Sequence, residues 1–504
     1  MNATAAQAHV GCLFGRGLIG VIDVGSNSIR LVVFEDGVRS PDYVFNEKTI
    51  CRLGEGLADT GKLSPEGRIR AAHALRRFTG LTKRMGVTKL FAVGTAALRE
   101  AEDGPEFREQ ILAETGVEIR VASGREEAQL AAQGVLLGWP SVEGVIADIG
   151  GSSLELAHIS NGEVLSAVST PAGHLRMGDS SESRGESETA RSALHALDSA
   201  AAAFAHVSGD LVLVGGAWRG LAKAQMERTN YPLHVLQGYE LSVAEADDLC
   251  EWAVKANPAE LKKLSGSSSA RASSLANGAI ALQRLLRTLK PDTVTISAFG
   301  LREGLIYEQM PPGMRRLDPL IAVAKATEDR SARYPGFGEE LFEWIRPLLG
   351  VVPGLSERLT RAACLLHDVN WRAHPDFRAA ACFATVARAN LSGVSHSHRL
   401  FLGAALVHRY KGALTDVAAK AAVRTLSEDA ARGAEVVGRG LRLGAMITGS
   451  VSGMLASTRL SVTEEDLILS VPPDVGALLG ERVERRFIAL ANALGRTGRI
   501  EPIG

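Results

Sequence analysis

Short apolar runs alternate with longer amphipathic stretches over the first 310 residues, which is the pattern of an α/β fold. Apolar runs predict strands at residues 18–24, 29–34, 90–93, 117–121, 145–149, 154–159 and 294–297. Amphipathic spacing predicts helices over residues 65–85 and 125–137. Residues 1–17 are small and polar with little periodicity, so we predict a flexible leader there.

The pattern changes after the two prolines at positions 311 and 312. Ala, Leu and Arg then recur at helical spacing, with few strand signals, to about residue 500. We therefore predict a domain boundary between residues 310 and 311 and an all-α domain over 311–504. Within the first region, residues 179–189 lack apolar side chains and predict a solvated loop, and the Ala-rich segment that follows to residue 206 predicts a helix.

One motif occurs twice, because VIDVGSNSIRLVVF from Val21 and IADIGGSSLELAHI from Ile146 align at a constant offset of 125 residues. Each copy predicts a β-hairpin with an aspartate, Asp23 or Asp148, before a tip of small residues. An isolated copy would more simply be a tight hairpin, but the duplication favours two loops that clamp phosphate through their backbone amides. The candidate phosphate-binding residues are Gly25, Ser26, Asn27, Ser28, Arg30, Gly150, Gly151, Ser152 and Ser153.

This pair of hairpins resembles those of the actin, Hsp70 and sugar-kinase superfamily. Ordered blocks at 21–35, 92–107, 123–135, 148–156, 213–223 and 297–307 further resemble the exopolyphosphatase and guanosine pentaphosphate phosphohydrolase family. The resemblance implies two actin-like (ribonuclease H-like) domains around a cleft, 18–137 and 138–310, whose last helix can return to the first domain. It also implies that residues 311–504 form an HD-like domain. Two departures are Ser152, where the family has glycine, and Ala217-Trp218, which replace a Thr-containing sequence.

Composition limits the partners and the compartment. The chain has 56 Lys and Arg against 57 Asp and Glu, so no global positive field attracts nucleic acid or an anionic membrane. No apolar stretch is long enough for a membrane helix, and the first basic residue, Arg16, comes too late for a secretory signal, so we predict a cytoplasmic protein. The five cysteines show no CxxC pattern and predict buried, reduced thiols: Cys12, Cys51, Cys250, Cys364 and Cys382.

Candidate catalytic groups lie in two of the family blocks. Glu126 and Glu127 follow Ser123 at the start of a predicted helix, where acidic residues also serve as caps. The resemblance implies that a catalytic glutamate activates water here. It places that role on Glu127, with Glu126 as the close alternative. Arg99 follows a predicted strand and can bind phosphate oxygens in a bidentate manner, although a surface helix arginine is an equal alternative.

Asp148 and Glu155 are seven residues apart on the second hairpin, so its two arms can bring both carboxylates near the tip. The simpler alternative is that one of the two acids lies at the turn and the other on a solvated strand face, without a shared cation. The resemblance implies that these residues, with Asp23, hold Mg²⁺ or another divalent cation such as Mn²⁺. Neither a GxSxG nucleophile nor a P-loop is present, which favours direct attack by water.

The resemblance implies an exopolyphosphatase that hydrolyses terminal orthophosphate from inorganic polyphosphate and forms a homodimer. A guanosine pentaphosphate 5′-phosphohydrolase is the first alternative. An actin-like ATP-binding module without hydrolysis is more distant, because LVGGAWRG is a poor adenosine-binding motif. A sensor of phosphorylated nucleotides without turnover is disfavoured, because the three candidate carboxylates Glu127, Asp148 and Glu155 are intact.

The C-terminal region holds Leu365-Leu366-His367-Asp368, which resembles the HD motif of metal-dependent phosphohydrolases. No histidine lies between residues 311 and 366 to complete such a metal site, so a buried His–Asp hydrogen bond is the favoured interpretation. Basic residues of this region could guide a polyphosphate chain or merely solvate helix faces. They are Arg315, Arg316, Arg330, Arg333, Arg399, Arg409 and Lys411.

Overall fold

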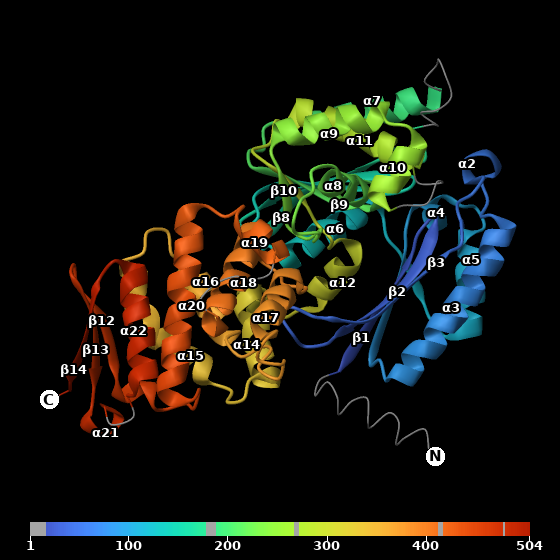
Figure 1. Cartoon of the computed structure of the whole chain (residues 1–504). Helices are drawn as coiled ribbons and strands as arrows, with labels where there is room; N and C mark the ends of the chain where they lie inside the picture. The colour runs from blue at the N-terminus through green and yellow to red at the C-terminus, as the bar shows by residue number, and fades with distance from the viewer. Residues whose placement is uncertain (1–16, 178–187, 267–271, 412–416, 477–478, 504) are drawn as a thin grey trace. The chain divides into compact units, whose positions relative to one another are not determined.

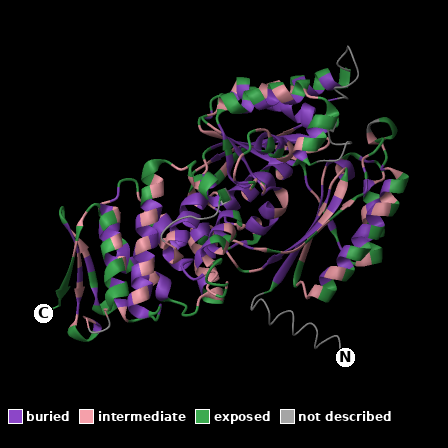
Figure 2. Cartoon of the chain, in the orientation of Figure 1, coloured by how far each residue is buried: buried purple, intermediate pink, exposed green. Residues whose placement is uncertain are grey.

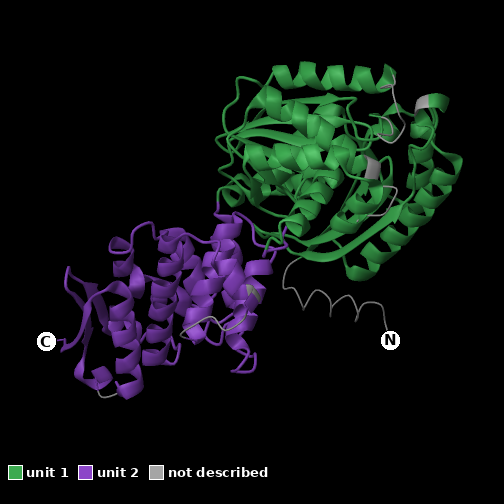
Figure 3. Ribbon diagram, turned by 45° about the horizontal axis from the view of Figure 1, so that its top comes forward, with its two compact units in different colours: residues 1–231, 236–316 green, residues 232–235, 317–504 purple. Residues whose placement is uncertain are grey.

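The computed structural model describes residues 17–177, 188–266, 272–411, 417–476 and 479–503. The chain divides into two compact units, residues 1–231 with 236–316 and residues 232–235 with 317–504 (Figure 3). The division therefore falls a few residues after the predicted boundary at 310/311. Unit 1 is one compact body, and the boundary at 137/138 stays a prediction. The predicted leader and most of the predicted loop at 179–189 lie outside the described residues.

The first sheet of unit 1 has the strand order β3-β2-β1-β4-β5 (Figure 1). Its strands are β1 (Leu18–Val24), β2 (Ser28–Glu35), β3 (Tyr43–Ile50), β4 (Lys89–Gly94) and β5 (Ile119–Val121). Helices α3 (Pro65–Met85) and α5 (Gly104–Thr115) pack on it, beside the short α2 (Leu57–Thr60) and α4 (Ala96–Glu100). The predicted α3 is confirmed to the residue. Ser64 caps it by accepting a hydrogen bond from the Gly67 amide, and Gly86 ends it with a left-handed φ of 73°.

The second sheet has the order β10-β11-β9-β6-β7-β8. Its strands are β6 (Gly144–Ile149), β7 (Leu154–Ser160), β8 (Glu163–Thr170), β9 (Asp210–Gly215), β10 (Tyr239–Leu241) and β11 (Val294–Ile296). The described residues of this half also form the helices α7 (Glu188–Ala202), α8 (Gly216–Arg228), α9 (Val243–Lys255), α10 (Pro258–Ser265) and α11 (Ala272–Leu289). The outer faces of α7 and α9 are exposed while their inner faces are buried (Figure 2).

Two helices, α6 (Gly124–Gly138) and α12 (Leu301–Gln309), pack against each other and share one hydrophobic core with strands of both sheets. Glycines allow the close approach. A Cβ at Gly134 would lie 2.0 Å from the Gly300 carbonyl oxygen, and one at Gly304 would lie 1.8 Å from that of Leu130. The crossing therefore requires glycine at both positions. It fixes the first turn of α6, where the candidate catalytic glutamates lie.

Unit 2 is mainly helical. Its helices are α14 (Pro319–Ser331), α15 (Phe337–Ile345), α16 (Glu357–Leu365), α17 (Arg378–Arg388), α18 (His396–Tyr410), α19 (Val417–Val423), α20 (Glu428–Thr448), α21 (Pro473–Gly476) and α22 (Glu481–Leu494), with short 3₁₀ segments at Arg346–Gly350 and Leu455–Ser457. The short α13 (Pro312–Arg315) ends unit 1. In the described residues no helix is both long enough and apolar enough to cross a membrane.

The predicted all-α character of residues 311–504 is wrong at the C-terminal end, although the region is helical up to α20. Strands β12 (Arg459–Val462), β13 (Asp466–Val471) and β14 (Thr497–Pro502) form a three-stranded sheet. β14 pairs in parallel with β13 after a crossover through α22. Its sequence TGRIEP is mostly polar and exposed, so hydrophobic alternation gave no strand signal there.

Several basic residues suggested as a polyphosphate track are structural. Arg399 is fully buried and donates hydrogen bonds to the carbonyls of Ala389 and Leu391 at 2.6 and 2.8 Å. Arg409 is also buried. Neither alternative, a polyphosphate track or solvated helix faces, therefore holds for these two arginines, because both are buried in the helical unit.

The HD-like motif forms a different network from the predicted one. Two donors of Arg333 bind the Asp368 carboxylate at 2.7 and 2.9 Å, and Tyr410 donates to the same group at 3.2 Å. His367 Nδ1 instead lies 2.8 Å from the Cys364 carbonyl. The predicted hydrogen bond between His367 and Asp368 is therefore wrong, and Arg333 binds Asp368 instead. The four described cysteines are free and buried, as predicted, and Cys12 lies outside the described residues.

Candidate active site

The two hairpins found by self-comparison have the same register. Asp23 lies opposite Arg30 across β1 and β2, and Asp148 lies opposite Glu155 across β6 and β7. Each tip is closed by one backbone hydrogen bond, from the Gly25 amide to the Ser28 carbonyl at 3.1 Å and from the Gly150 amide to the Ser153 carbonyl at 2.9 Å. The sequence repeat is therefore also a structural repeat.

The tips of the two hairpins meet. Ser26 Oγ lies 3.4 Å from Ser152 Oγ, although 126 residues separate them along the chain. A Cβ added at Gly151 would lie 4.0 Å from Ser26 Cβ and 3.2 Å from Leu175 Cδ1, so the second tip is also packed on the far side. The carbonyl of Asn27 accepts the amides of residues 51 and 52, which fixes the first tip. Serines at both tips are close enough to contact one small anion.

The first turn of α6 separates the two candidate glutamates. Ser123 Oγ accepts the Glu126 amide at 3.2 Å, and the Glu126 carboxylate accepts the Ser123 amide at 2.8 Å, which makes a capping box. These bonds hold the pKa of Glu126 below its usual range. Glu127 is 7% exposed and pairs with Arg99 Nη1, which also donates to the Ala122 carbonyl at 2.7 Å. Only Glu127 of the two points into the interior.

Buried carboxylates gather around Glu127, and each affects the others. Burial raises the pKa of Glu127 to about 7; Arg99 opposes this rise, whereas Asp148 and Asp23 add to it. Burial also raises the pKa of Asp148 to about 6, and Asp23 contributes to that rise. Burial, Glu127 and Asp148 raise the pKa of Glu155, which accepts a hydrogen bond from Ser169 Oγ at 2.8 Å. The site is therefore short of positive charge at this end.

Three arginines, Arg30, Arg219 and Arg302, interact electrostatically with the same carboxylates. Arg302 lies 3.8 Å from Asp23, and Arg30 donates to Asn46 at 2.7 Å. Arg219 is the charged group that most lowers the pKa of Asp148. Glu303, which follows Arg302 in the sequence, is buried and accepts hydrogen bonds from Tyr43 Oη at 3.1 Å and from the Gly300 amide at 2.8 Å.

Sequence reasoning missed four residues of this charge network: Tyr43, Arg219, Arg302 and Glu303. Two blocks of the family resemblance, 213–223 and 297–307, contain three of them. The charged residues inside those blocks could have indicated that they belong to the site. Nothing in the sequence indicates a role for Tyr43, because its contact with Glu303 spans 260 positions.

The carboxylates of the site provide part of the ligand set that a divalent cation needs. Among the described residues, no three His, Cys, Asp or Glu side chains come close enough to hold a metal by themselves. Mg²⁺ commonly binds through one or two carboxylates, with water and substrate phosphates as the remaining ligands. Burial and then neighbouring carboxylates raise the pKa values of Asp148 and Glu155, and a bound cation would favour the charged form of both groups. The donor set therefore fits a cation that arrives with phosphate.

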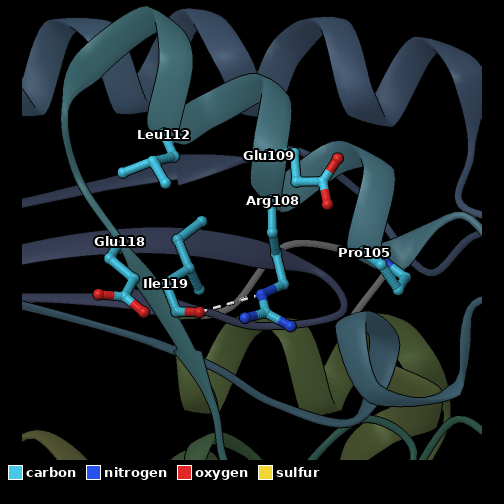
Figure 4. A pocket seen from close by; sticks show the side chains of 6 residues that line it. All are labelled: Pro105, Arg108, Glu109, Leu112, Glu118 and Ile119. Atoms are coloured by element: carbon cyan, nitrogen blue, oxygen red, sulfur yellow. Dashed lines mark hydrogen bonds between the residues drawn. The ribbon is translucent and has the colours of Figure 1, made fainter.

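A surface hollow lies elsewhere in unit 1, beside α5 and β5 (Figure 4). Its lining residues are Pro105, Arg108, Glu109, Leu112, Glu118 and Ile119. Arg108 donates to the Ile119 carbonyl at 3.1 Å and is thereby fixed against the strand. The hollow contains none of the hairpin, carboxylate or arginine groups described above, so it is not the candidate active site.

Two family models match the chain. The model of the Ppx/GppA phosphatase family matches residues 32–312, and that of the exopolyphosphatase C-terminal region matches residues 320–500. Exopolyphosphatase 1 of Mycobacterium tuberculosis is 27% identical over 314 residues, which cover 58% of this chain and 88% of that protein. Guanosine-5′-triphosphate,3′-diphosphate pyrophosphatase of Aeromonas salmonicida is 27% identical over 377 residues, which cover 70% and 72%.

Solved structures share the fold of unit 1. The Aquifex aeolicus member of the Ppx/GppA family aligns with a TM-score of 0.51 and 23% identity, over 58% of this chain and 97% of that one. An exopolyphosphatase from Cytophaga hutchinsonii aligns with a TM-score of 0.52 and 24% identity, over 57% and 96%. The predicted actin-like α/β fold followed by a helical region is confirmed.

Proposed function

Because this chain belongs to the Ppx/GppA phosphatase family and is a phosphoanhydride hydrolase, we propose that it removes terminal orthophosphate from inorganic polyphosphate. One observation carries the proposal: the buried carboxylate of Glu127 pairs with Arg99, and the charges of Asp148 and Asp23 raise its pKa. Those aspartates belong to the two hairpins whose tips meet, so a base, carboxylates that could hold a cation and loops of small residues occur together.

Glu127 is the general base in this proposal. A carboxylate with a pKa near 7 accepts a proton from water more readily than one with an ordinary pKa. As the proton moves to Glu127, the water oxygen forms a bond to the terminal phosphorus. The bond from that phosphorus to the bridging oxygen breaks, and the shortened chain leaves as a phosphate anion. Arg99, fixed by the Ala122 carbonyl, orients Glu127 and stabilises charge on the transferred group.

The hairpin tips bind the phosphates. Their small side chains let backbone amides approach an anion, and the serines add hydroxyl donors. The proposed phosphate-binding residues are Gly25, Ser26, Asn27, Ser28, Arg30, Gly150, Gly151, Ser152 and Ser153. The contact between Ser26 and Ser152 supports the two tips acting on one group.

Asp148 and Glu155, with Asp23 beside them, would hold Mg²⁺ or a similar cation such as Mn²⁺. The mutual influence of these buried carboxylates, which places them in one electrostatic group, supports this part of the proposal. When bound, a divalent cation neutralises charge that develops on the phosphate oxygens. Ser169 keeps Glu155 oriented by donating to one of its oxygens.

Hydrolysis of guanosine pentaphosphate at its 5′ end is the second candidate function. It is favoured by the Aeromonas salmonicida relative, whose match extends over 70% of this chain and so reaches into the C-terminal region. Against it, Ala217 and Trp218 stand where the family has a Thr-containing sequence, and both are buried in α8.

The action at chain ends can be tested with polyphosphate whose two termini are blocked by phosphoramidate formation. We expect the protein with Mg²⁺ to release orthophosphate from free-ended chains and to leave the blocked chains intact. Shortening of blocked chains at a similar rate would show internal cleavage and contradict the proposal. The variant Glu127→Gln serves as the inactive control.

A further inference from the structure

Arg219 occupies a defined place beside the carboxylates. Helix α8 begins at Gly216, directly after β9, and β9 runs parallel to β6 with Val214 opposite Asp148. Side chains in the first turn of a helix lean toward its N-terminus. Arg219 therefore leans back toward the end of β6 that carries Asp148, and it is the strongest of the charges that lower the pKa of that aspartate.

The residues on either side of Arg219 in the first turn of α8 pack in the core and so limit the direction of the Arg219 side chain. Trp218 is 1% exposed and donates through Nε1 to the Gly278 carbonyl at 2.8 Å. Gly220 packs so closely on Leu275 that a Cβ would lie 2.4 Å from its Cδ2. Because both neighbours face α11, Arg219 faces the site.

Arg219 has charged neighbours but no bonded partner among the described residues. None of them forms a hydrogen bond with its guanidinium group, and none of their carboxylates lies within 4.0 Å of it. Of the neighbouring charges, Arg302 lowers the pKa of Arg219 most. Arg219 in turn lowers the pKa of Arg30. Nε of Arg302 is also buried without a hydrogen-bond partner. The three guanidinium groups are thus close enough to affect one another's pKa, and Arg302 has a buried donor that no described residue satisfies.

The protein's own acids do not satisfy these donors. Glu303 is already bonded to Tyr43 and to the Gly300 amide. Asp23 approaches only Arg302, at 3.8 Å, and Asp148 interacts with Arg219 only at longer range. The buried Nε of Arg302 is costly to leave without an acceptor unless a ligand supplies one. A ligand that suits three guanidinium groups is a multiply charged anion with several oxygens, such as phosphate groups in a chain.

We propose that Arg219 binds the phosphate next to the transferred one, and that with Arg302 and Arg30 it forms a second phosphate subsite. This inference rests on the proposed function for the identity of the ligand. Asp148 links the two groups, because it raises the pKa values of Glu127 and Glu155 and its own pKa is lowered by Arg219 and Arg302. A substrate with at least two consecutive phosphates would contact both groups.

Direct binding of tripolyphosphate tests the subsite without relying on turnover. Calorimetry in the Glu127→Gln background prevents hydrolysis during the titration. We expect Arg219→Gln to weaken tripolyphosphate binding by about 10-fold to 100-fold, as the loss of charge-assisted hydrogen bonds predicts. Arg219→Lys should recover part of that loss because it retains the charge. Arg191→Gln, which changes an exposed arginine on α7, is the matched control and should bind like the parent.

The result separates this inference from the proposed function. Tripolyphosphate binding that is unchanged in Arg219→Gln, with an unfolding temperature equal to the parent's, would overturn the subsite even if polyphosphate is hydrolysed. Arginine-dependent binding in a protein that releases no phosphate from any chain would keep the subsite and refute the function. If Arg219→Gln were poorly folded, Arg219→Lys provides the same comparison by calorimetry, and a Kd for tripolyphosphate equal to that of the Glu127→Gln parent would again overturn the inference.

Discussion

Replacing Glu127 with glutamine keeps the size of the side chain and an oxygen that can accept from Arg99, but it removes the ionisable group. If Glu127 takes the proton from water, turnover should fall by about 10²-fold to 10⁴-fold. Binding of tripolyphosphate should change little, because the arginines and the hairpin tips remain. Glu126→Gln is the matched control, since Glu126 is the capping residue, and it should retain most of the activity.

The same substitution should stabilise the protein at alkaline pH. Burial raises the pKa of Glu127 from 4.5 to about 7, so the folded state binds the proton more tightly than the unfolded state does. Stability is therefore lost as the pH rises from about 4.5 to about 7, and the penalty is complete above that window. At about 1.4 kcal/mol per pH unit, the penalty is at most about 3.5 kcal/mol. Glutamine avoids it but gives Arg99 a neutral partner, so we expect a net gain of about 1 to 3 kcal/mol at pH 8.

Denaturant unfolding of both proteins between pH 5 and pH 8, with activity measured on the same samples, checks the two expectations together. The stability gain of Glu127→Gln should shrink toward pH 5, where the wild-type carboxyl group is mostly protonated. A gain that is independent of pH, or a loss at pH 8, would refute the raised pKa. Near wild-type turnover in Glu127→Gln combined with an inactive Glu126→Gln would move the base to the neighbouring residue.

Three further predictions concern other parts of the molecule. Asp148→Asn and Glu155→Gln should each raise the Mg²⁺ concentration needed for half-maximal activity, and an unchanged Mg²⁺ titration in both would remove them from the cation site. Trp218→Ala should lower the free energy of unfolding by about 3 to 5 kcal/mol through the cavity it leaves, which chemical denaturation would measure. Asp368→Asn should destabilise unit 2 by about 1 to 3 kcal/mol by weakening its bonds to Arg333, while EDTA leaves wild-type unfolding unchanged; an EDTA-induced drop would instead indicate a structural metal.

The repeat was the part of the site that the sequence predicted best. Asp23 and Asp148 occupy equivalent positions because each hairpin needs small residues at its tip and an apolar strand on either side, and such local requirements are visible in sequence. Helix α3 was equally clear, since Ser64, Pro65 and Gly86 mark its ends. The family resemblance favoured Glu127 over the adjacent Glu126 as the base, and the three-dimensional fold adds that Glu126 caps the helix while Glu127 is buried.

Contacts between distant segments could not be predicted in this way. Tyr43 meets Glu303, and Ser26 meets Ser152, only after two sheets have packed on α6 and α12. Arg399 looked like a surface cation because composition does not show which arginines satisfy buried carbonyls. The cytoplasmic location, the homodimer and the HD-like character of the C-terminal region stay predictions.

The most direct test of the account is orthophosphate release from long-chain polyphosphate, guanosine pentaphosphate and ATP, measured in parallel with Mg²⁺ at equal enzyme concentration. We expect kcat/KM to be highest for polyphosphate, lower for guanosine pentaphosphate and negligible for ATP, with all release abolished in Glu127→Gln. A clear preference for guanosine pentaphosphate would assign the second candidate function. Release from none of the three substrates by a folded wild-type protein would contradict the central claim that this site hydrolyses phosphoanhydrides.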